Sequence, residues 1–402
     1  MIVKENSVSL KELLWHSANA LEAELTEHRR HLHAHPELSL EEGETAEYVA
    51  SCLRQLGLET RTGIGGHGVV ADIEGGRPGS AIALRADMDA LPIHEETGLA
   101  FSSRQPGKMH ACGHDAHTAI LLGAAKLLVQ HKEHIAGRVR LLFQPAEEIV
   151  TGAQAMLEEG VLNGVDQIYG LHNLPTLPAG KVATAAGPLM GSVDRIELTV
   201  HGKGAHGAMP EQGADPIVAS AAIIGSLQTI SSRELSPFSP VIVTFGSIHA
   251  GEANNVIPPL AELTGTVRTF DPEVRATMKE RLTRIVESVA EAHRCLAELR
   301  FIEQNPVLVN DSGCNRYAED TLDWLLGADK RTAAAPTLAG EDFARFVEKI
   351  PGCFFWLGSG PQEGAEQAYG LHHPKFNLNE DCLVPGAAAM AALVLHGGHA
   401  EN

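Results

Sequence analysis

The segment between about residues 187 and 302 most constrains the fold, because its pattern of strands and helices is complete in itself. Alternating or β-branched runs predict strands at 193–200, 241–248, 261–270 and 297–301, and helical patterns predict helices at 216–230 and 272–293. The resulting order, βαββαβ, is the ferredoxin-like split pattern. We therefore expect residues 187–302 to form a small domain inserted into a larger one, which residues 1–186 and 303–402 build together.

The flanking sequence predicts an α/β domain. Apolar residues recur at helical spacing from residue 10 to 56 and are interrupted at His35-Pro36, which favours two helices joined by a turn. Short aliphatic runs at 68–73, 81–84 and 139–143, with a helix at 116–129 among them, predict a mostly parallel sheet with helices on both faces. A chain of 402 residues is long enough for two such cores.

Composition excludes some classes of partner. Acidic residues outnumber basic ones by 51 to 31, and the formal charge of -20 repels nucleic acids and anionic membranes. The six cysteines have no paired spacing, which is typical of free or metal-bound thiols in a reducing compartment. No signal peptide or stretch of about 20 apolar residues is present. We expect a soluble cytoplasmic protein.

The motif HACGHD (110–115), followed by His117, gathers ligands that suit a transition metal. Cys112 and His114 lie two residues apart, and Gly113 between them allows a tight bend, so both can face one ion. The alternative is that Cys112 is a small buried residue and that the histidines cap a helix or lie on the surface.

Further polar residues follow the predicted strands. Asp87 and Asp89 come after the run 81–84, Glu147 and Glu148 after 139–143, and His172 after 167–171. Because the carboxyl ends of parallel strands meet at one edge, these groups can converge. One carboxylate of the Glu147-Glu148 pair can then bind metal while the other acts as a general base; alternatively, the pair is the acidic start of a helix.

Three histidines are ambiguous when taken singly. His172 and His372 each end an apolar stretch, where a lone histidine is more often a hydrogen-bonded loop residue than a ligand. His206 lies in a glycine-rich turn of the predicted insert. It is either an ordinary turn residue or a donor that stabilises a developing oxyanion, delivered by domain closure or by a neighbouring subunit.

Taken together, the ordered motifs resemble the M20 metallopeptidase family, in particular its amidohydrolase branch of hippurate hydrolases, N-acyl-amino-acid aminoacylases and plant auxin-conjugate hydrolases. The resemblance runs through nearly the whole chain. The motifs that carry it are RHLHAHPE (30–37), LRADMDALP (84–92), HACGHD (110–115), QPAEE (144–148), GLH (170–172), GKGAH (202–206), NVIP (255–258), GEDF (340–343) and LHHP (371–374).

The resemblance implies a role for each matching residue. One or two divalent ions (Mn, Zn, Co or Ni) would be held by Cys112, His114, Glu148, His172 and His372, and Glu147 would be the general base. Asp87 stands where other branches have a histidine ligand, so it and Asp89 would orient the site. His206 would reach an active site from the dimerisation domain, and Asn255 and Arg268 would help to bind the carboxylate end of the substrate. Residues 338–340 depart from the family pattern, which bears on the lining of the pocket.

These implications lead to one main functional hypothesis and several alternatives. The main one is metal-dependent hydrolysis of the amide bond of an N-acyl amino acid by a homodimer or a higher homo-oligomer, with no nucleic-acid or membrane partner. A dipeptidase or aminopeptidase activity of the same fold is an alternative. A second is a metal-free thiol hydrolase in which Cys112 pairs with His114 or His117, and a third is a binding protein without catalysis. Chelation distinguishes the metalloenzyme from the thiol enzyme.

Overall fold

The computed structural model describes residues 9–361 and 369–396 and divides the chain into two compact units. The first unit contains residues up to Gly187, 309–335 and 345 onward, and the second contains 188–308 and 336–344. The chain thus leaves the first unit after Gly187 and returns to it at residue 309. The short segment 336–344 is grouped with the second unit, which the sequence pattern did not indicate.

The first unit is built on an eight-stranded sheet of order β1-β2-β4-β3-β5-β16-β6-β15. Neighbouring strands are parallel from β4 to β16, whereas β2 is antiparallel to both of its neighbours, β1 and β4. The strands are β1 (Thr60–Ile64), β2 (Gly68–Glu74), β3 (Arg77–Asp87), β4 (Ala136–Gln144), β5 (Gln167–Pro178), β6 (Val182–Thr184), β15 (Arg331–Ala333) and β16 (Gly352–Gly360). A mostly parallel centre with an antiparallel edge is common in such sheets.

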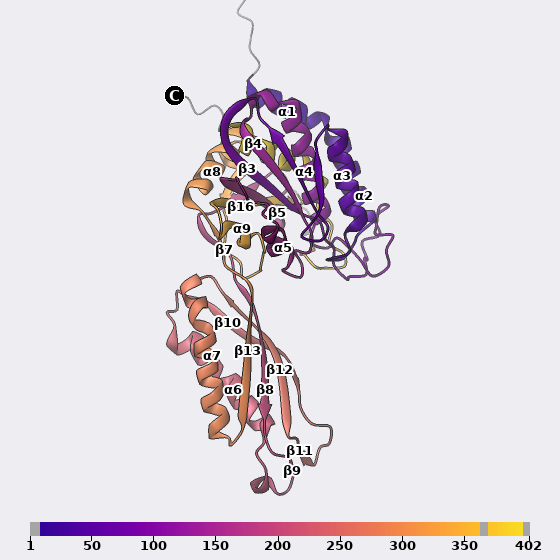
Figure 1. Ribbon diagram of the computed structural model, residues 1–402. Coiled ribbons are helices and arrows are strands. Elements are labelled where there is room, and N and C mark those ends of the chain that lie inside the picture. Colours follow the sequence, from indigo (N-terminus) through magenta and orange to yellow (C-terminus); the bar gives the residue numbers. More distant parts are fainter. Residues whose placement is uncertain (1–8, 362–368, 397–402) are drawn as a thin grey trace, which may run out of the picture. The chain divides into compact units, whose positions relative to one another are not determined.

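Helices pack against this sheet and against one another (Figure 1). They are α1 (Leu10–Ala20), α2 (Glu22–Ala34), α3 (Gly43–Gln55), α4 (His114–Gln130), α5 (Gly152–Glu158), α8 (Ser312–Leu326), α9 (Ala344–Val347) and α10 (Leu383–Leu395). The core joins α1, α3, α4, α8 and α10 to alternate residues of the strands, such as Leu141 and Phe355. The intervening residues, such as Leu142 and Phe354, are also buried, so both faces of the sheet are covered.

The N-terminal region differs from the two helices expected between residues 10 and 56. It contains three, because α1 ends at Ala20, where Leu21 N–H bonds back to Ala18 O at 3.0 Å and a new helix begins at Glu22. The apolar spacing continues across this break, so the sequence did not reveal it. The break before Pro36 is confirmed: α2 ends at Ala34, and His35 has left helical geometry.

The second unit has a four-stranded antiparallel sheet of order β10-β12-β8-β13, with helices α6 and α7 on one side of it (Figure 1). Its core is formed by these helices and the alternate strand residues that face them. Its elements are β8 (Val193–His201), β9 (Ala205–His206), α6 (Pro216–Leu227), β10 (Val241–His249), β11 (Val256–Ile257), β12 (Leu260–Thr269), α7 (Pro272–Ala292) and β13 (Leu296–Asn305). The strands β7 (Gly187–Met190) and β14 (Leu308–Asn310) flank the unit. No helix in the described residues has the length and apolar character needed to cross a membrane.

Candidate metal centre

Three neighbouring parallel strands bring the predicted polar residues to one edge of the large sheet. Asp87, the last residue of β3, is level with Gln144 of β4, and Glu147 and Glu148 follow in the next turn. Arg85 of β3 is level with Gly170 of β5, which places His172 close to the level of Asp87. The expected convergence at the carboxyl ends is therefore observed for these strands.

One detail of that expectation is wrong. His172 lies within β5 and does not follow a strand, because β5 continues to Pro178 while pairing with β16, where His172 is level with Trp356. The apolar run that ends at Leu171 is shorter than the strand. Sequence hydrophobicity alone did not reveal this, because polar residues continue a strand wherever a partner strand supplies hydrogen bonds.

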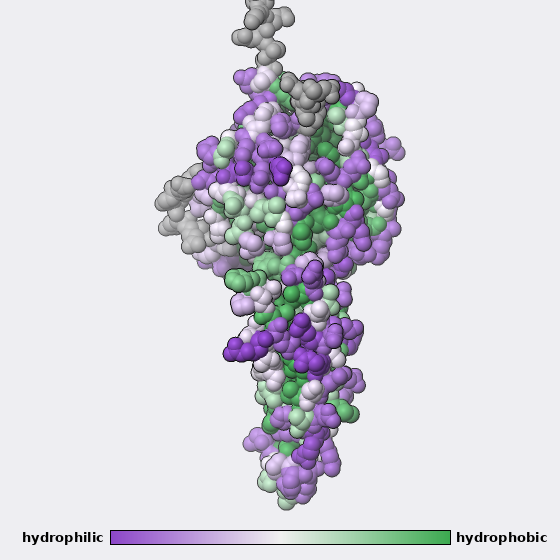
Figure 2. Space-filling model, turned by 90° about the vertical axis from the view of Figure 1, so that its left-hand side faces the viewer, coloured by the Kyte–Doolittle hydropathy of each residue, from purple (hydrophilic) through white to green (hydrophobic). Residues whose placement is uncertain are grey.

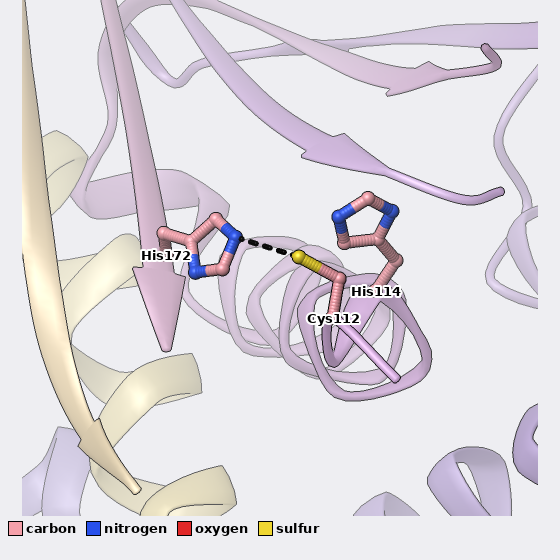
Figure 3. A group of neighbouring side chains, drawn as sticks. All are labelled: Cys112, His114 and His172. Carbon is pink, nitrogen blue, oxygen red and sulfur yellow. Dashed lines mark hydrogen bonds between the residues drawn. The ribbon is translucent and has the colours of Figure 1, made fainter. Parts of the chain in front are cut away.

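Cys112 and His114 project from the start of α4 on either side of Gly113. Gly113 has φ 93°, a conformation that favours glycine, and a Cβ atom built there would lie 2.2 Å from Asn173 Nδ2. Figure 3 shows the Cys112 and His114 side chains beside His172 of β5. Cys112 Sγ lies 3.4 Å from His172 Nε2.

Glu147, Glu148 and His372 extend this cluster. Ligand atoms lie within 4.8 Å of one another in three overlapping groups: Cys112, His114 and His172; Cys112, Glu148 and His372; and His114, Glu147 and Glu148. The side chain of His372 is 53% exposed and that of Glu148 only 9%, so the cluster is open on the His372 side. The structure thus brings together all five residues expected as ligands and the expected base.

Hydrogen bonds leave suitable atoms of these residues available to a cation. His172 Nδ1 donates to Asn173 O at 2.8 Å, which leaves the Nε2 lone pair facing the cluster. His114 Nδ1 donates to Asp89 Oδ1 at 3.2 Å. Among the described residues, His114 Nε2 and Glu148 Oε1 are buried and have no hydrogen-bond partner. Buried polar atoms without partners are costly, so the donor set fits a metal ion.

Asp87 and His117 form a second layer of contacts behind the cluster. Asp87 accepts from Arg85 Nη1 at 2.7 Å and from His117 Nδ1 at 2.6 Å, and His117 Nε2 in turn accepts from Asn173 N–H at 2.9 Å. Both ring nitrogens of His117 are therefore occupied, although Asp87, His114 and His117 also lie close enough to share an ion. This arrangement favours orientation of the site over ligation by His117.

Sequence reasoning missed Asn173 and the buried ion pair behind α4. Asn173 Nδ2 donates to Cys112 O at 2.6 Å, and its position directly after His172 was the available signal. Asp115 Oδ2 accepts from Arg29 Nε at 2.9 Å and from His33 Nδ1 at 2.7 Å, which fixes the first turn of α4 next to His114. Nothing in local spacing pairs residues so far apart.

The electrostatics of the cluster explain why it attracts a cation. Burial, opposed by His114 and aided by the nearby Asp89 carboxylate, raises the pKa of Glu148 to about 7. Burial and Glu148 raise the pKa of the Cys112 thiol well above its usual range. Burial would lower the pKa of His114, but Asp87 and Cys112 outweigh it and hold that pKa well above normal. The site therefore retains protons that a bound cation would replace.

The three residues expected to act from the insert lie in the second unit. His206, on β9, is exposed, and its Nδ1 accepts from Ala208 N–H at 3.1 Å, so the neutral ring carries its proton on Nε2. Asn255 is adjacent, since its carbonyl accepts from Gly207 N–H at 2.7 Å. Arg268 is at the other end of β12, half-buried, with Nη1 donating to Leu338 O at 3.2 Å. The structure thus groups His206 with Asn255, through the pairing of β9 with β11, and places Arg268 near the end of β12.

Comparison with known proteins relates most of the chain to one peptidase family. The family model "Peptidase family M20/M25/M40" matches residues 83–396. An N-acetyl-L-cysteine deacetylase of Bacillus subtilis is 44% identical over 370 residues, covering 91% of this chain and 86% of the relative. Thermostable carboxypeptidase 1 of Saccharolobus solfataricus is 41% identical over 392 residues, covering 96% and 99%.

A solved structure agrees with these matches. A Bacillus subtilis protein described as a dinuclear metal-binding peptidase of family M20 superposes with a TM-score of 0.82 at 40% identity, covering 94% of this chain and 99% of that one. Its dinuclear centre accords with the cluster of candidate ligands around Cys112 and Glu148. The chain belongs to peptidase family M20/M25/M40 and is a hydrolase of the kind that uses divalent metal ions.

Proposed function

We propose that this hydrolase cleaves the amide bond of N-acyl amino acids and releases a carboxylic acid and a free amino acid. The observation that carries the proposal is the pair Glu147-Glu148 beside the cluster of His114 and Cys112. One carboxylate oxygen of the pair, Glu148 Oε1, has no hydrogen-bond partner in the part of the chain that the structure describes. Two adjacent carboxylates in different surroundings suit a division between metal binding and proton transfer.

Cys112, His114, Glu148, His172 and His372 would hold one or two ions of Mn, Zn, Co or Ni. When bound, such an ion lowers the pKa of a coordinated water from about 16 towards about 7 and polarises a carbonyl group. Asp89 supports this arrangement, since its Oδ1 accepts from His114 and its Oδ2 accepts from Glu148 N–H at 3.0 Å. Asp87 contributes by fixing His117 and Arg85.

Glu147 would act as base and then as acid. Glu147 is buried and lies within reach of His114 and Glu148, and it follows a turn that fixes its backbone. It would take a proton from the attacking water and pass that proton to the departing amine nitrogen, so that no net proton change remains on the residue. His206 would donate from Nε2 to the developing oxyanion, a role that its bonded Nδ1 supports.

We propose that the second unit is a ferredoxin-like insert that dimerises the enzyme. His206 and Arg268 lie towards opposite ends of β12, whose ten residues extend roughly 30 Å at about 3.3 Å each. One copy of the unit cannot bring both side chains to one small substrate, which favours a contribution from a second copy. The edge strand β10 exposes Ile242 and Ile248, and Figure 2 shows apolar residues (green) interrupting the polar surface of this unit.

The names of the relatives bear on the substrate. An N-acetyl-L-cysteine deacetylase supports a short acyl group on an amino acid, whereas a carboxypeptidase supports the alternative of peptide substrates. Both classes present a free carboxylate, to which the Arg268 guanidinium and Asn255 are suited. The six free thiols support a reducing compartment, and we propose a cytoplasmic location on that ground.

The metal-free thiol hydrolase is the weaker alternative. Its nucleophile would have to be a thiolate, but burial and Glu148 raise the pKa of Cys112. His117 cannot serve as its base, because both ring nitrogens are already hydrogen-bonded.

A substrate panel with a variant of the base tests the proposal. Hippurate, N-acetyl amino acids, indole-acyl conjugates and dipeptides are assayed with Mn, Zn, Co and Ni, before and after EDTA. We expect N-acyl amino acids to be the best substrates and Glu147→Gln to bind metal normally while losing about 10²- to 10⁴-fold in kcat. Full activity of Glu147→Gln would remove it as the base. Tight binding of N-acyl amino acids without hydrolysis would favour a binding protein.

A further inference from the structure

Glu147 and Glu148 follow a residue, Ala146, whose backbone conformation is unfavourable for any amino acid other than glycine. Ala146, directly before Glu147, has φ 53°, in the left-handed region that residues other than glycine seldom adopt. The turn is closed by Thr151 N–H and Gly152 N–H, which donate to Ala146 O at 3.2 and 3.1 Å. Any relaxation of Ala146 would rotate the peptide that leads into Glu147.

Two side chains hold this turn from outside. Glu42 Oε1 accepts from Ala146 N–H at 2.8 Å, and Asp89 Oδ2 accepts from Glu148 N–H at 3.0 Å. The two contacts lie on either side of Glu147. The contact from Asp89 therefore fixes the expected metal ligand, and the contact from Glu42 fixes the residue before the expected base.

Glu42 is an unusual residue for a purely structural position. It is fully buried, and among the described residues it forms no ion pair and its Oε2 has no hydrogen-bond partner. Burying a carboxylate without a cation is costly, and an apolar side chain would fill the same space without that cost. The cost is explained if the position requires an acceptor for Ala146 N–H.

We propose that Glu42 is a positioning residue that holds Ala146 in its left-handed conformation and thereby aims Glu147 at the reacting water. The part that concerns catalysis rests on the proposed function, in which Glu147 is the base. The proposal adds to the site a residue that lies 104 positions before Ala146 and outside the motifs compared above.

The test removes or keeps the acceptor at position 42. Glu42→Leu and Glu42→Ala remove it, the first while keeping most of the buried volume, and Glu42→Gln keeps an oxygen that can accept from Ala146 N–H. The matched control is Glu37→Ala, because Glu37 lies in the same segment but caps α3, accepting from Thr45 N–H at 2.8 Å and Glu44 N–H at 3.2 Å.

Two readouts are compared in metal-loaded enzyme. Amide hydrogen exchange of the peptide that contains Ala146 should become about tenfold faster or more in Glu42→Leu and Glu42→Ala, and stay unchanged in Glu42→Gln and Glu37→Ala. In the first two variants kcat should fall by about 10²-fold, with KM and metal content unchanged. Glu42→Gln should retain most of kcat, and Glu37→Ala should lose thermal stability only.

The outcomes separate this proposal from the proposed function. Unchanged exchange at Ala146 in both acceptor-free variants would overturn the proposal, whatever the activity. Faster exchange with an unchanged kcat would also overturn it, because the turn would then not aim the base. A wild-type enzyme that hydrolyses none of the panel would overturn the proposed function, while hydrogen exchange would still decide whether Glu42 holds the turn.

Discussion

Replacing Asp89 with asparagine should weaken metal binding without removing a ligand. Asp89 accepts three hydrogen bonds: from His114 Nδ1 at 3.2 Å, from Ser39 Oγ at 2.6 Å and from Glu148 N–H at 3.0 Å. A carboxylate accepts all three, because it has two acceptor oxygens and no hydrogen. An asparagine has one oxygen and one NH₂ group, so it must turn a donor towards one side.

Either orientation of the amide is unfavourable. If the NH₂ group faces His114, then Nδ1 becomes the acceptor and the ring proton moves to Nε2, the atom that faces the cluster. If the NH₂ group faces the other way, Glu148 N–H loses its acceptor, which costs about 1–3 kcal/mol for a buried donor. Loss of such an orienting contact weakens metal binding by about 10- to 100-fold, equivalent to about 1.4–2.7 kcal/mol.

The assay is a competition titration of Zn and Mn against a chromophoric chelator, combined with urea unfolding of the metal-free protein. Ser39→Ala is the matched control, since it removes one hydroxyl donor to Asp89 and leaves the other two contacts intact. We expect its metal affinity to stay within about threefold of wild type. An affinity of Asp89→Asn within that same range, with unchanged stability of the metal-free protein, would refute the reasoning.

Three further predictions follow from the same contacts. Metal affinity should rise with pH between 6 and 8, because a cation must displace protons that the metal-free site keeps on Glu148, Cys112 and His114. The pKa of Glu148 is about 7, and the pKa values of Cys112 and His114 are also raised. Calorimetry in two buffers measures the proton release, and an affinity that is independent of pH would contradict the prediction. Gly152→Ala should lower the free energy of unfolding by about 1–3 kcal/mol or more, since the added Cβ would lie 1.6 Å from Pro145 O. Gly225→Ala is the control and should not destabilise the protein, because a Cβ there would have no atom within 4 Å. Equal urea midpoints for the two variants would count against the turn as described. His206→Ala should lower kcat and leave metal content unchanged, and an unchanged kcat would remove His206 from the mechanism. Sedimentation of the wild-type enzyme should show a dimer, and a monomer with full activity would remove the need for a second copy.

Much of the site could be predicted because its chemistry is local in sequence. The motif around Cys112 and His114 lies within a few residues. Hydrophobic runs identify the strand that Asp87 ends and the strand that Glu147-Glu148 follow. Parallel strands that end at one edge then bring these groups together, as the register of Asp87 and Gln144 illustrates. The prediction that His172 follows a strand was wrong, because the length of β5 depends on its partner strand β16.

The amino-acid sequence alone predicted the kinds of ligands, the alternation of strands and helices and a βαββαβ segment, because side-chain chemistry and hydrophobic periodicity are properties of neighbouring residues. The folded structure was needed to show which nitrogen of His114 and His172 faces the cluster, that both nitrogens of His117 are hydrogen-bonded, and that Glu42 contacts Ala146. Those features depend on hydrogen bonds between residues far apart in the chain. No local pattern specifies such bonds, because they form only once the sheet has set the register of its strands.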